Sequence, residues 1–315
     1  MRRLAPTPRA RARLYLAAQA AAGALWWVAV FASGDVRRWT LGSWDPAVLV
    51  GPDLVLFVGG SALAAALGNR VIALTTATWT MGVTLALLAQ GMTERTAGPG
   101  VVLMVVAAGG SVAAAATLWS GRLPTGWFFV GPFAFSVAAE APGARHLRRS
   151  LAQLVVFWTV FFVVVPMVLA AAEERLRLDW PALQDGRWDR VGIVAFALAS
   201  ALGLWSCVTM SLVGRGTPLP AATARDLVVA GPYRCVRNPM AVAGAVQTAG
   251  IGLWRGSWTV IAVAAAGAVA WDVLIRPEEE ADLAARFGPP YQRYAAAVRC
   301  WLPSRPWRDR APGAS

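Results

Sequence analysis

Long hydrophobic blocks alternate with short arginine-rich or acidic segments along the whole chain. The blocks are Leu14–Ala32, Val48–Leu67, Val71–Gln90, Val101–Ser120, Leu151–Ala172, Val191–Val213, Met240–Leu253 and Ser257–Ile275. A helix of about 20 apolar residues crosses a hydrocarbon core about 30 Å thick. The pattern therefore predicts an all-α, polytopic integral membrane protein of about seven to eight transmembrane helices.

The block Met240–Leu253 is shorter than the other blocks. It is followed almost at once by Ser257–Ile275, and Trp254-Arg255-Gly256 lies between the two. Glycine readily adopts the left-handed conformation that ends a helix. We therefore expect a tight helical hairpin here.

The first block follows five arginines and has the order of charges found in a secretory signal peptide. It is long for the apolar part of such a peptide, and it lacks a convincing small-x-small cleavage site before the Asp35–Arg38 cluster. We expect a retained first helix.

The charge of the chain changes this picture little. The chain is 57% hydrophobic and 15% charged, against about 25% charged residues in soluble domains. A net charge of +12 is also found in nucleic-acid-binding proteins, but here the arginines cluster between apolar blocks, as the positive-inside rule expects of cytoplasmic loops. We therefore expect no nucleic-acid partner, and we predict cytoplasmic N- and C-termini in a bacterial-type inner or plasma membrane.

Cysteine and histidine are too sparse to predict a metal site. Cys207, Cys235 and Cys300 are far apart and form no CxxC pair. The single histidine, His146, has no cysteine or second histidine near it in the sequence. This favours neither a disulfide framework, nor a zinc site, nor a Ser-His-Asp triad.

A polar segment with two turns, Asp226–Met240, directly precedes the short block. Gly231-Pro232 and Asn238-Pro239 interrupt helical geometry at two points. Irregular backbone at membrane depth is tolerated only where protein buries it or it lines a polar cavity. Arg234 and Arg237 are three residues apart, so one helical turn would place both on one face. Taken alone, the segment fits an interfacial loop with positive-inside arginines equally well.

Two further polar segments follow the last hydrophobic block. Arg276–Glu280 contains three consecutive carboxylates, which are costly beside lipid headgroups unless they are paired or solvated. A solvated helix start with Pro277 in its first turn is the alternative. In Phe287–Val298, Tyr291, Tyr294 and Val298 recur at helical spacing, which is typical of packing against a neighbouring helix.

The order of these three segments, with a hydrophobic hairpin between the first and the second, resembles the isoprenylcysteine carboxyl methyltransferase family and its relatives, including the phospholipid N-methyltransferases. The positions that match the family pattern are Leu227-Val228, Gly231 to Met240, Glu279-Glu280, Leu283, Phe287-Gly288, Tyr291, Tyr294 and Leu302-Pro303. The resemblance divides the chain into N-terminal transmembrane helices of unassigned role (1–189), a methyltransferase core (190–305) and a disordered tail (306–315).

The resemblance implies S-adenosylmethionine as the cofactor, bound on the cytoplasmic side between the two-turn segment and the carboxylates. The residues implied to bind it are Leu227, Val229, Gly231, Tyr233, Arg237, Asn238, Pro239, Met240, Glu279 and Glu280. The residues implied to act in catalysis are Arg237, Arg276 and Glu279, with Arg276 near the methyl-transfer channel.

Two departures from the family pattern bear on the substrate. Asn238 stands where the prenylcysteine enzymes usually have histidine, and Ala241 replaces an aromatic residue. Asparagine exchanges hydrogen bonds but does not change charge near neutral pH.

The residue types also favour one acceptor. A carboxylate acceptor is already ionised at neutral pH and needs no base, whereas an amine or thiol must first lose a proton. No obvious base is present, although Glu279 or Tyr233 could serve. We therefore predict methylation of a carboxylate on a prenylcysteine-like or other lipophilic substrate.

Other functions stay open at this point. Within enzymes, the alternatives are a phospholipid N-methyltransferase and a thiol S-methyltransferase. In another class, the alternative is a non-enzymatic membrane protein or transporter, for which Asp53 and Asp272 would be the relevant intramembrane acids.

Overall fold

The structure, a computed structural model, describes residues 7–123, 125, 136–140, 142–184, 186–217 and 222–307. Nearly all of the predicted tail, 308–315, lies outside the described residues. The chain forms two compact units, one of Met1–Pro124 with Ala172–Leu178 and one of Thr125–Ala171 with Asp179–Ser315. The functional division predicted near residue 190 is a different boundary and stays a prediction.

Seven helical stretches in the described part of the chain are long and apolar enough to cross a membrane. They are Pro8–Ala32, Pro46–Leu67, Arg70–Glu94, Gly98–Ser120, Gly143–Arg175, Arg187–Val213 and Trp258–Phe287. The only β-pairing among the described residues is a single bridge between Val137 and Thr223. The prediction of an all-α, polytopic integral membrane protein is confirmed.

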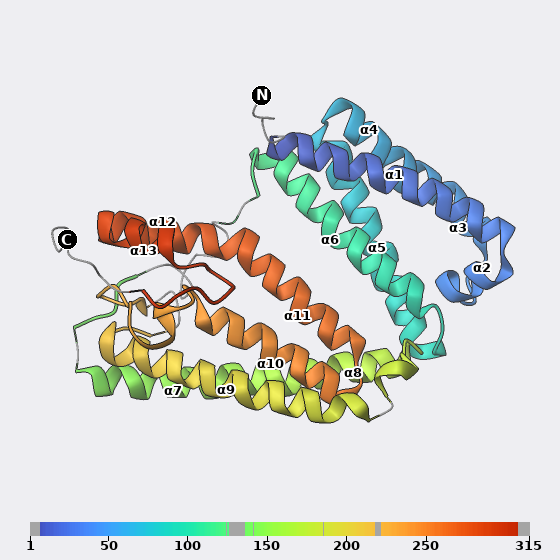
Figure 1. The fold of residues 1–315 in the computed structure, drawn as a ribbon. Helices are drawn as coiled ribbons and strands as arrows, with labels where there is room; N and C mark the ends of the chain where they lie inside the picture. The colour runs from blue at the N-terminus through green and yellow to red at the C-terminus, as the bar shows by residue number, and fades with distance from the viewer. Residues whose placement is uncertain are drawn as a thin grey trace. The chain divides into compact units, whose positions relative to one another are not determined.

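The first unit is built from helices that pack against one another (Figure 1). They are α1 (Pro8–Ala32), α2 (Gly34–Leu41), α3 (Pro46–Asp53), α4 (Gly60–Leu67), α5 (Arg70–Glu94) and α6 (Gly98–Ser120), with a π-helical segment at Leu54–Gly59. Alanines dominate one buried cluster, which contains Ala12, Ala64, Ala73, Ala77, Ala114 and Ala115 beside Leu16 and Leu118. Small side chains let transmembrane helices approach closely, so van der Waals contact replaces the hydrophobic effect as the driving force.

The second unit contains the remaining helices. They are α7 (Gly143–Trp158), α8 (Val165–Arg175, its last residues in the first unit), α9 (Arg187–Val213), α10 (Pro239–Arg255), α11 (Trp258–Ala270), α12 (Arg276–Phe287) and α13 (Pro289–Ala297). A π-helical segment, Thr159–Val164, joins α7 to α8, and 3-10 turns lie at Pro181–Leu183 and Gly231–Arg234. α9 packs against α7 and α10, and α10 packs against α11 (Figure 1).

Two glycines bring α9 and α10 into backbone contact. A Cβ on Gly192 would lie 2.5 Å from the carbonyl oxygen of Gly250, and a Cβ on Gly250 would lie 2.8 Å from the carbonyl oxygen of Gly192. Distances of this size exclude any side chain at either position unless the helices move apart. This crossing fixes α10, whose first turn carries the end of the two-turn segment.

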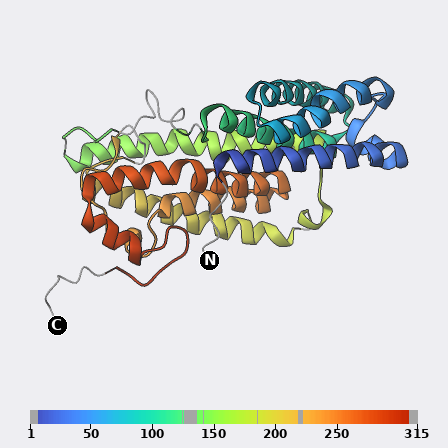
Figure 2. The same ribbon diagram turned by 90° about the horizontal axis from the view of Figure 1, so that it is seen from above.

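The predicted hairpin is present. α10 ends at Gly256, which has a φ of 63°, and α11 begins two residues later with the Ser257 side chain accepting a hydrogen bond from the Val260 amide. A π-helical segment, Trp271–Ile275, then joins α11 to α12 without a break in the helix (Figures 1 and 2). The acidic helix is thus a continuation of a transmembrane helix.

Two segments differ from the expectation. The stretch Gly143–Ser150, which lies before the hydrophobic block Leu151–Ala172 and was expected to be a loop between two blocks, forms the first turns of α7 and buries His146. Charged residues do not prevent a helix when its other face is buried, and this stretch is strongly amphipathic. The short helix α2 was not predicted either, because it has too few apolar residues to register as a block.

Candidate active site

The first turn of the two-turn segment is a 3-10 turn, Gly231–Arg234, that lies against α9. Gly231 has a φ of 51°, and a Cβ there would lie 2.8 Å from Thr209 Oγ1 and 3.2 Å from Trp205 Nε1. Both the backbone conformation and the lack of space therefore require glycine. After this turn the chain leads into Arg237 and Asn238, whose side chains contact α12.

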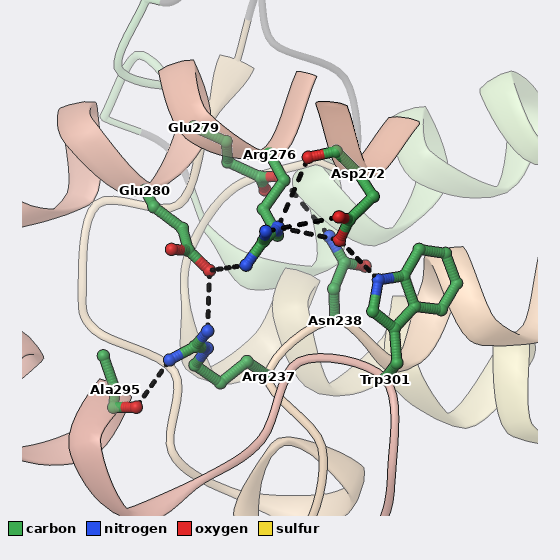
Figure 3. Close-up of polar contacts among 8 residues, drawn as sticks. All are labelled: Arg237, Asn238, Asp272, Arg276, Glu279, Glu280, Ala295 and Trp301. Carbon is green, nitrogen blue, oxygen red and sulfur yellow. Dashed lines mark hydrogen bonds and ion pairs between the residues drawn. The ribbon is translucent and has the colours of Figure 1, made fainter. Parts of the chain in front are cut away.

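Asn238 closes the segment and begins α10. Its side-chain Oδ1 accepts a hydrogen bond from the Ala241 amide at 3.0 Å, which caps the helix, and Pro239 occupies the first helical position. Its Nδ2 donates to Glu279 Oε2 at 3.3 Å (Figure 3). One asparagine thus caps a helix and contacts a carboxylate, a combination that the amide group suits because it has both a donor and an acceptor.

Arg237 joins the segment to two other elements. Its Nη2 donates to Glu280 Oε1 at 2.9 Å, and its Nη1 donates to the Ala295 carbonyl at 2.5 Å (Figure 3). Ala295 lies in the last turn of α13, where carbonyl groups lack partners within the helix. The planar guanidinium therefore ties the segment to both α12 and α13.

A second guanidinium neutralises the acids one turn earlier. Arg276 Nε lies 2.9 Å from Asp272 Oδ1, and its Nη1 lies 3.9 Å from Glu280 Oε1 (Figure 3). Trp301 Nε1 donates to the same Asp272 oxygen at 2.7 Å. Two guanidinium groups thus pair with the carboxylates of Asp272 and Glu280, and the third carboxylate, that of Glu279, has no guanidinium partner among the described residues.

The carboxylate without a described cationic partner is Glu279. Its one hydrogen bond with another described side chain comes from Asn238, and no described cation lies within ion-pair distance of it. Glu278, the preceding residue, instead accepts a hydrogen bond from Thr125 at 2.7 Å. Glu279 is therefore the carboxylate with free acceptor capacity toward a ligand.

A buried tyrosine cluster backs this ionic cluster. Tyr294 donates its hydroxyl to the Tyr233 carbonyl at 2.6 Å, and Leu227 and Val229 pack against Tyr291 and Tyr294. Burial, followed by the negative charge of Glu279, raises the pKa of Tyr233 well above its ordinary value of 10.0. The Tyr233 phenol is therefore protonated at neutral pH, so it can donate a hydrogen bond to a ligand and is not suited to act as a base.

Two buried donors at the site lack partners among the described residues. They are the Tyr233 hydroxyl and Arg237 Nε. An unsatisfied buried polar group costs about 1–3 kcal/mol, so such groups are often completed by a ligand. Two donors and one free carboxylate fit a ligand that carries both a carboxylate and an ammonium or hydroxyl groups, as S-adenosylmethionine does.

A comparison with known families matched part of the chain. Residues 188–289, from the start of α9 to the start of α13, match the family model of the phospholipid methyltransferases. This part of the chain, called the methyltransferase region below, is similar to that family of membrane methyltransferases. No curated protein and no solved structure matched the chain.

The methyltransferase region contains the predicted site residues in three groups. The structure joins Arg237, Glu280 and Arg276 in one ionic network, and it pairs Asn238 with Glu279 beside that network (Figure 3). The others lie on either side of it. Gly231 and Tyr233 are in the 3-10 turn, Pro239 and Met240 begin α10, and Leu227 and Val229 contact the tyrosine cluster.

Arg234 does not share a face with Arg237. Its Nε donates to the Trp307 carbonyl at 3.2 Å, and the Trp307 amide donates to the Arg234 carbonyl at 2.8 Å. The reason is that the segment leaves helical geometry after Arg234, so a spacing of three residues no longer aligns the two side chains. Arg234 instead attaches the chain after α13, at Trp307, to the 3-10 turn.

Two residues of the ionic network, Asp272 and Trp301, and one residue outside it, Arg286, were not in the predicted set. Asp272 carried a usable signal, because it precedes Arg276 by four residues on a helix. Trp301 had no local signal for its bond to Asp272. Arg286 donates to Thr223 Oγ1 at 2.9 Å and to the Ala224 carbonyl, and so attaches the residues just before the two-turn segment to α12.

Proposed function

We propose that the chain is an S-adenosylmethionine-dependent methyltransferase that methylates a carboxylate of a prenylcysteine-like or other lipophilic substrate. The family match supports methyl transfer in a membrane. The observation that supports S-adenosylmethionine as the cofactor is the Glu279 carboxylate without an ion pair among the described residues, together with two buried donors without described partners, Tyr233 OH and Arg237 Nε.

The site residues would divide the polar groups of the cofactor between them. The donors, Arg237 and Tyr233, suit its carboxylate, and the acceptor, Glu279, suits its ammonium or ribose hydroxyls. Backbone groups near Leu227 and Val229, which lie on the tyrosine cluster, would contact the rest of the cofactor. When bound, the cofactor supplies an electrophilic methyl group on a sulfonium.

The protein then has to orient the acceptor and exclude water from it. Arg276 is the cation suited to attract an acceptor carboxylate, because its side chain is 30% exposed while its bonds to Asp272 hold it in place. No base is needed for an acceptor that is already ionised. This agrees with the protonated state of Tyr233.

A phospholipid amine is the second candidate acceptor, and the description of the matched family favours it. An amine must lose a proton before or during transfer. Glu279, the carboxylate without an ion pair in the described network, is the residue that could accept that proton.

Cofactor binding is the first test. Purified protein would be titrated with S-adenosylmethionine by calorimetry, comparing wild type with Glu279→Gln and Arg237→Ala. The matched control is Glu278→Gln, which changes the neighbouring carboxylate that is bonded to Thr125. We expect binding by wild type and by the control, and about tenfold or more weaker binding by both site variants. No binding by wild type, or equal binding by all four proteins, contradicts the proposed site.

Acceptor identity is the second test. Transfer of a labelled methyl group would be measured for farnesylated cysteine, phosphatidylethanolamine and an alkyl thiol in lipid nanodiscs. The proposal requires the farnesylated cysteine to be the best acceptor, with label released by mild base as expected of an ester. Preferential labelling of the phospholipid would select the second candidate, and Glu279→Gln would then abolish transfer at every pH.

A further inference from the structure

A cavity of about 350 Å³ lies among the helices of the first unit, outside the region that matches the methyltransferase family. Its wall is mainly aromatic and aliphatic and includes Trp26, Trp27, Trp44, Phe57, Leu103 and Met104. Small-molecule sites have volumes of about 300–1,000 Å³ and are lined mostly by apolar side chains with a few polar groups. The cavity has the size and composition of such a site.

One acidic residue, Asp53, lines this cavity and is only 8% exposed. Its Oδ2 accepts a hydrogen bond from Trp27 Nε1 at 2.8 Å, and its Oδ1 accepts one from Trp79 Nε1 at 3.0 Å. Two ionised oxygens have about four acceptor positions, so the two indole donors leave about half of them free. Asp53 ends α3 directly before the π-helical segment Leu54–Gly59, a geometry that is frequent at functional sites.

No lysine, arginine or histidine is among the residues that line the cavity, all of which belong to the described part of the chain. The other polar wall residues are already bonded to protein. Gln19 accepts from Tyr15 at 2.7 Å and from Ser111 at 3.0 Å, and it donates to Ser61 at 2.9 Å. Asp53 is thus the one charged group of the wall, and it lies in a membrane-spanning stretch, where an uncompensated charge is costly.

We propose that this cavity binds an amphiphilic cation, with an ammonium group against Asp53 and an apolar chain along the aromatic wall. An ammonium supplies the charge and the donors that the free acceptor positions of Asp53 lack. Tryptophan faces also attract cations, and Trp26, Trp27 and Trp44 line the same space. The site does not depend on the proposed methyl transfer, because none of its residues belongs to the methyltransferase region.

The test uses the full-length protein in phosphatidylcholine nanodiscs with two photoreactive probes, dodecylamine and dodecanol, each carrying a diazirine at the chain end. Labelled peptides are identified by mass spectrometry, and affinity is obtained from the dependence of labelling on probe concentration. We expect the amine to label α1, α3, α5 or α6 with about tenfold or more higher affinity than the alcohol.

Two variants locate the headgroup and the chain. Asp53→Asn should reduce the affinity for the amine to that for the alcohol. Ala107→Phe should abolish labelling by either probe, because Ala107 lines the cavity, whereas Val105→Phe on the same helix is the control, since Val105 is 52% exposed and is not part of the wall. Thermal unfolding and size-exclusion profiles equal to those of wild type check that all three variants are folded.

Three results would overturn the proposal. They are equal labelling by amine and alcohol, amine labelling that Asp53→Asn leaves unchanged, and labelling that Ala107→Phe and Val105→Phe affect alike. Because cofactor binding is measured separately, a failed cavity and a failed methyltransferase site give different results.

Discussion

Arg237 donates to two partners that come from different helices, the Glu280 carboxylate of α12 and the Ala295 carbonyl of α13. Its side chain is only 15% exposed, so solvent weakens the Glu280 pair little. The two bonds leave the guanidinium in different directions from a planar, rigid group. A lysine ammonium is a point charge and reproduces one such contact but not the geometry of both.

We therefore predict that Arg237→Lys loses the bond to α13 and weakens S-adenosylmethionine binding by about tenfold. Calorimetric titration of the purified variant checks this. Arg293→Lys is the control, because Arg293 is exposed on α13. Cofactor affinity equal to that of wild type would mean that a positive charge is sufficient at this position and that the two-bond geometry of the guanidinium is not required.

The tyrosine cluster makes stability depend on pH in the alkaline range. Burial is the main cause that raises the pKa of Tyr233, Tyr291 and Tyr294 above the ordinary value of 10.0. Above about pH 10 the unfolded chain releases phenolic protons that the folded chain retains. Stability from these groups is therefore fully present below about pH 10 and falls as the pH rises beyond it.

We predict that Tyr291→Phe makes this alkaline decline shallower, by up to about 1.4 kcal/mol for each pH unit above 10. Thermal unfolding in detergent between about pH 8 and 11 measures it, with the values near pH 8 as the baseline of each protein. Parallel declines in wild type and variant would show that the Tyr291 phenol does not contribute.

At this scale the sequence predicted the residue types better than their partners. Arg237, Asn238, Glu279 and Glu280 were predicted together, because the family pattern specifies them. The Ala295 carbonyl could not be predicted as a partner of Arg237, since it is a backbone group that becomes available only where α13 ends.

Among the elements, α9 and α10 come into backbone contact at Gly192 and Gly250. Hydrophobicity predicted both helices but not their crossing, because a glycine in an apolar block has no distinct signal in the pattern. The first turns of α7 were not predicted as a helix, because they are charged and amphipathic and so resembled a loop.

We predict that Gly250→Ala destabilises the protein by about 1–3 kcal/mol, because the added Cβ would overlap the Gly192 carbonyl. Gly244→Ala, on the same helix, is the matched control, since a Cβ there meets nothing within 4 Å. Thermal unfolding of both variants in one detergent gives the comparison. If they are equally stable, the two helices do not approach as closely as the glycines indicate.

For the molecule as a whole, α10 decides the topology. It has 17 residues and is shorter than the seven stretches found long enough to span. If it crosses the bilayer as half of the hairpin with α11, the chain crosses eight times and its two ends lie on the same side. This agrees with the predicted cytoplasmic location of both termini.

We predict that a cysteine in the hairpin turn and a cysteine in α13 lie on opposite sides of the membrane. In a protein without its three native cysteines, Arg255→Cys should react with an impermeant thiol reagent added to intact cells, and Arg293→Cys should react only after the cells are opened. Reaction of both in intact cells, or of neither, contradicts an α10 that crosses.

The unbroken helix Trp258–Phe287 has a mechanical consequence for the ionic cluster. Asp272, Arg276, Glu279 and Glu280 share one rigid axis with the lipid-spanning residues, so the register of that helix fixes their depth and their direction. One residue inserted into α11 would turn all four by about 100° and shift them by about 1.5 Å. The length of α11 therefore sets the depth of the four charged side chains relative to the hydrocarbon core.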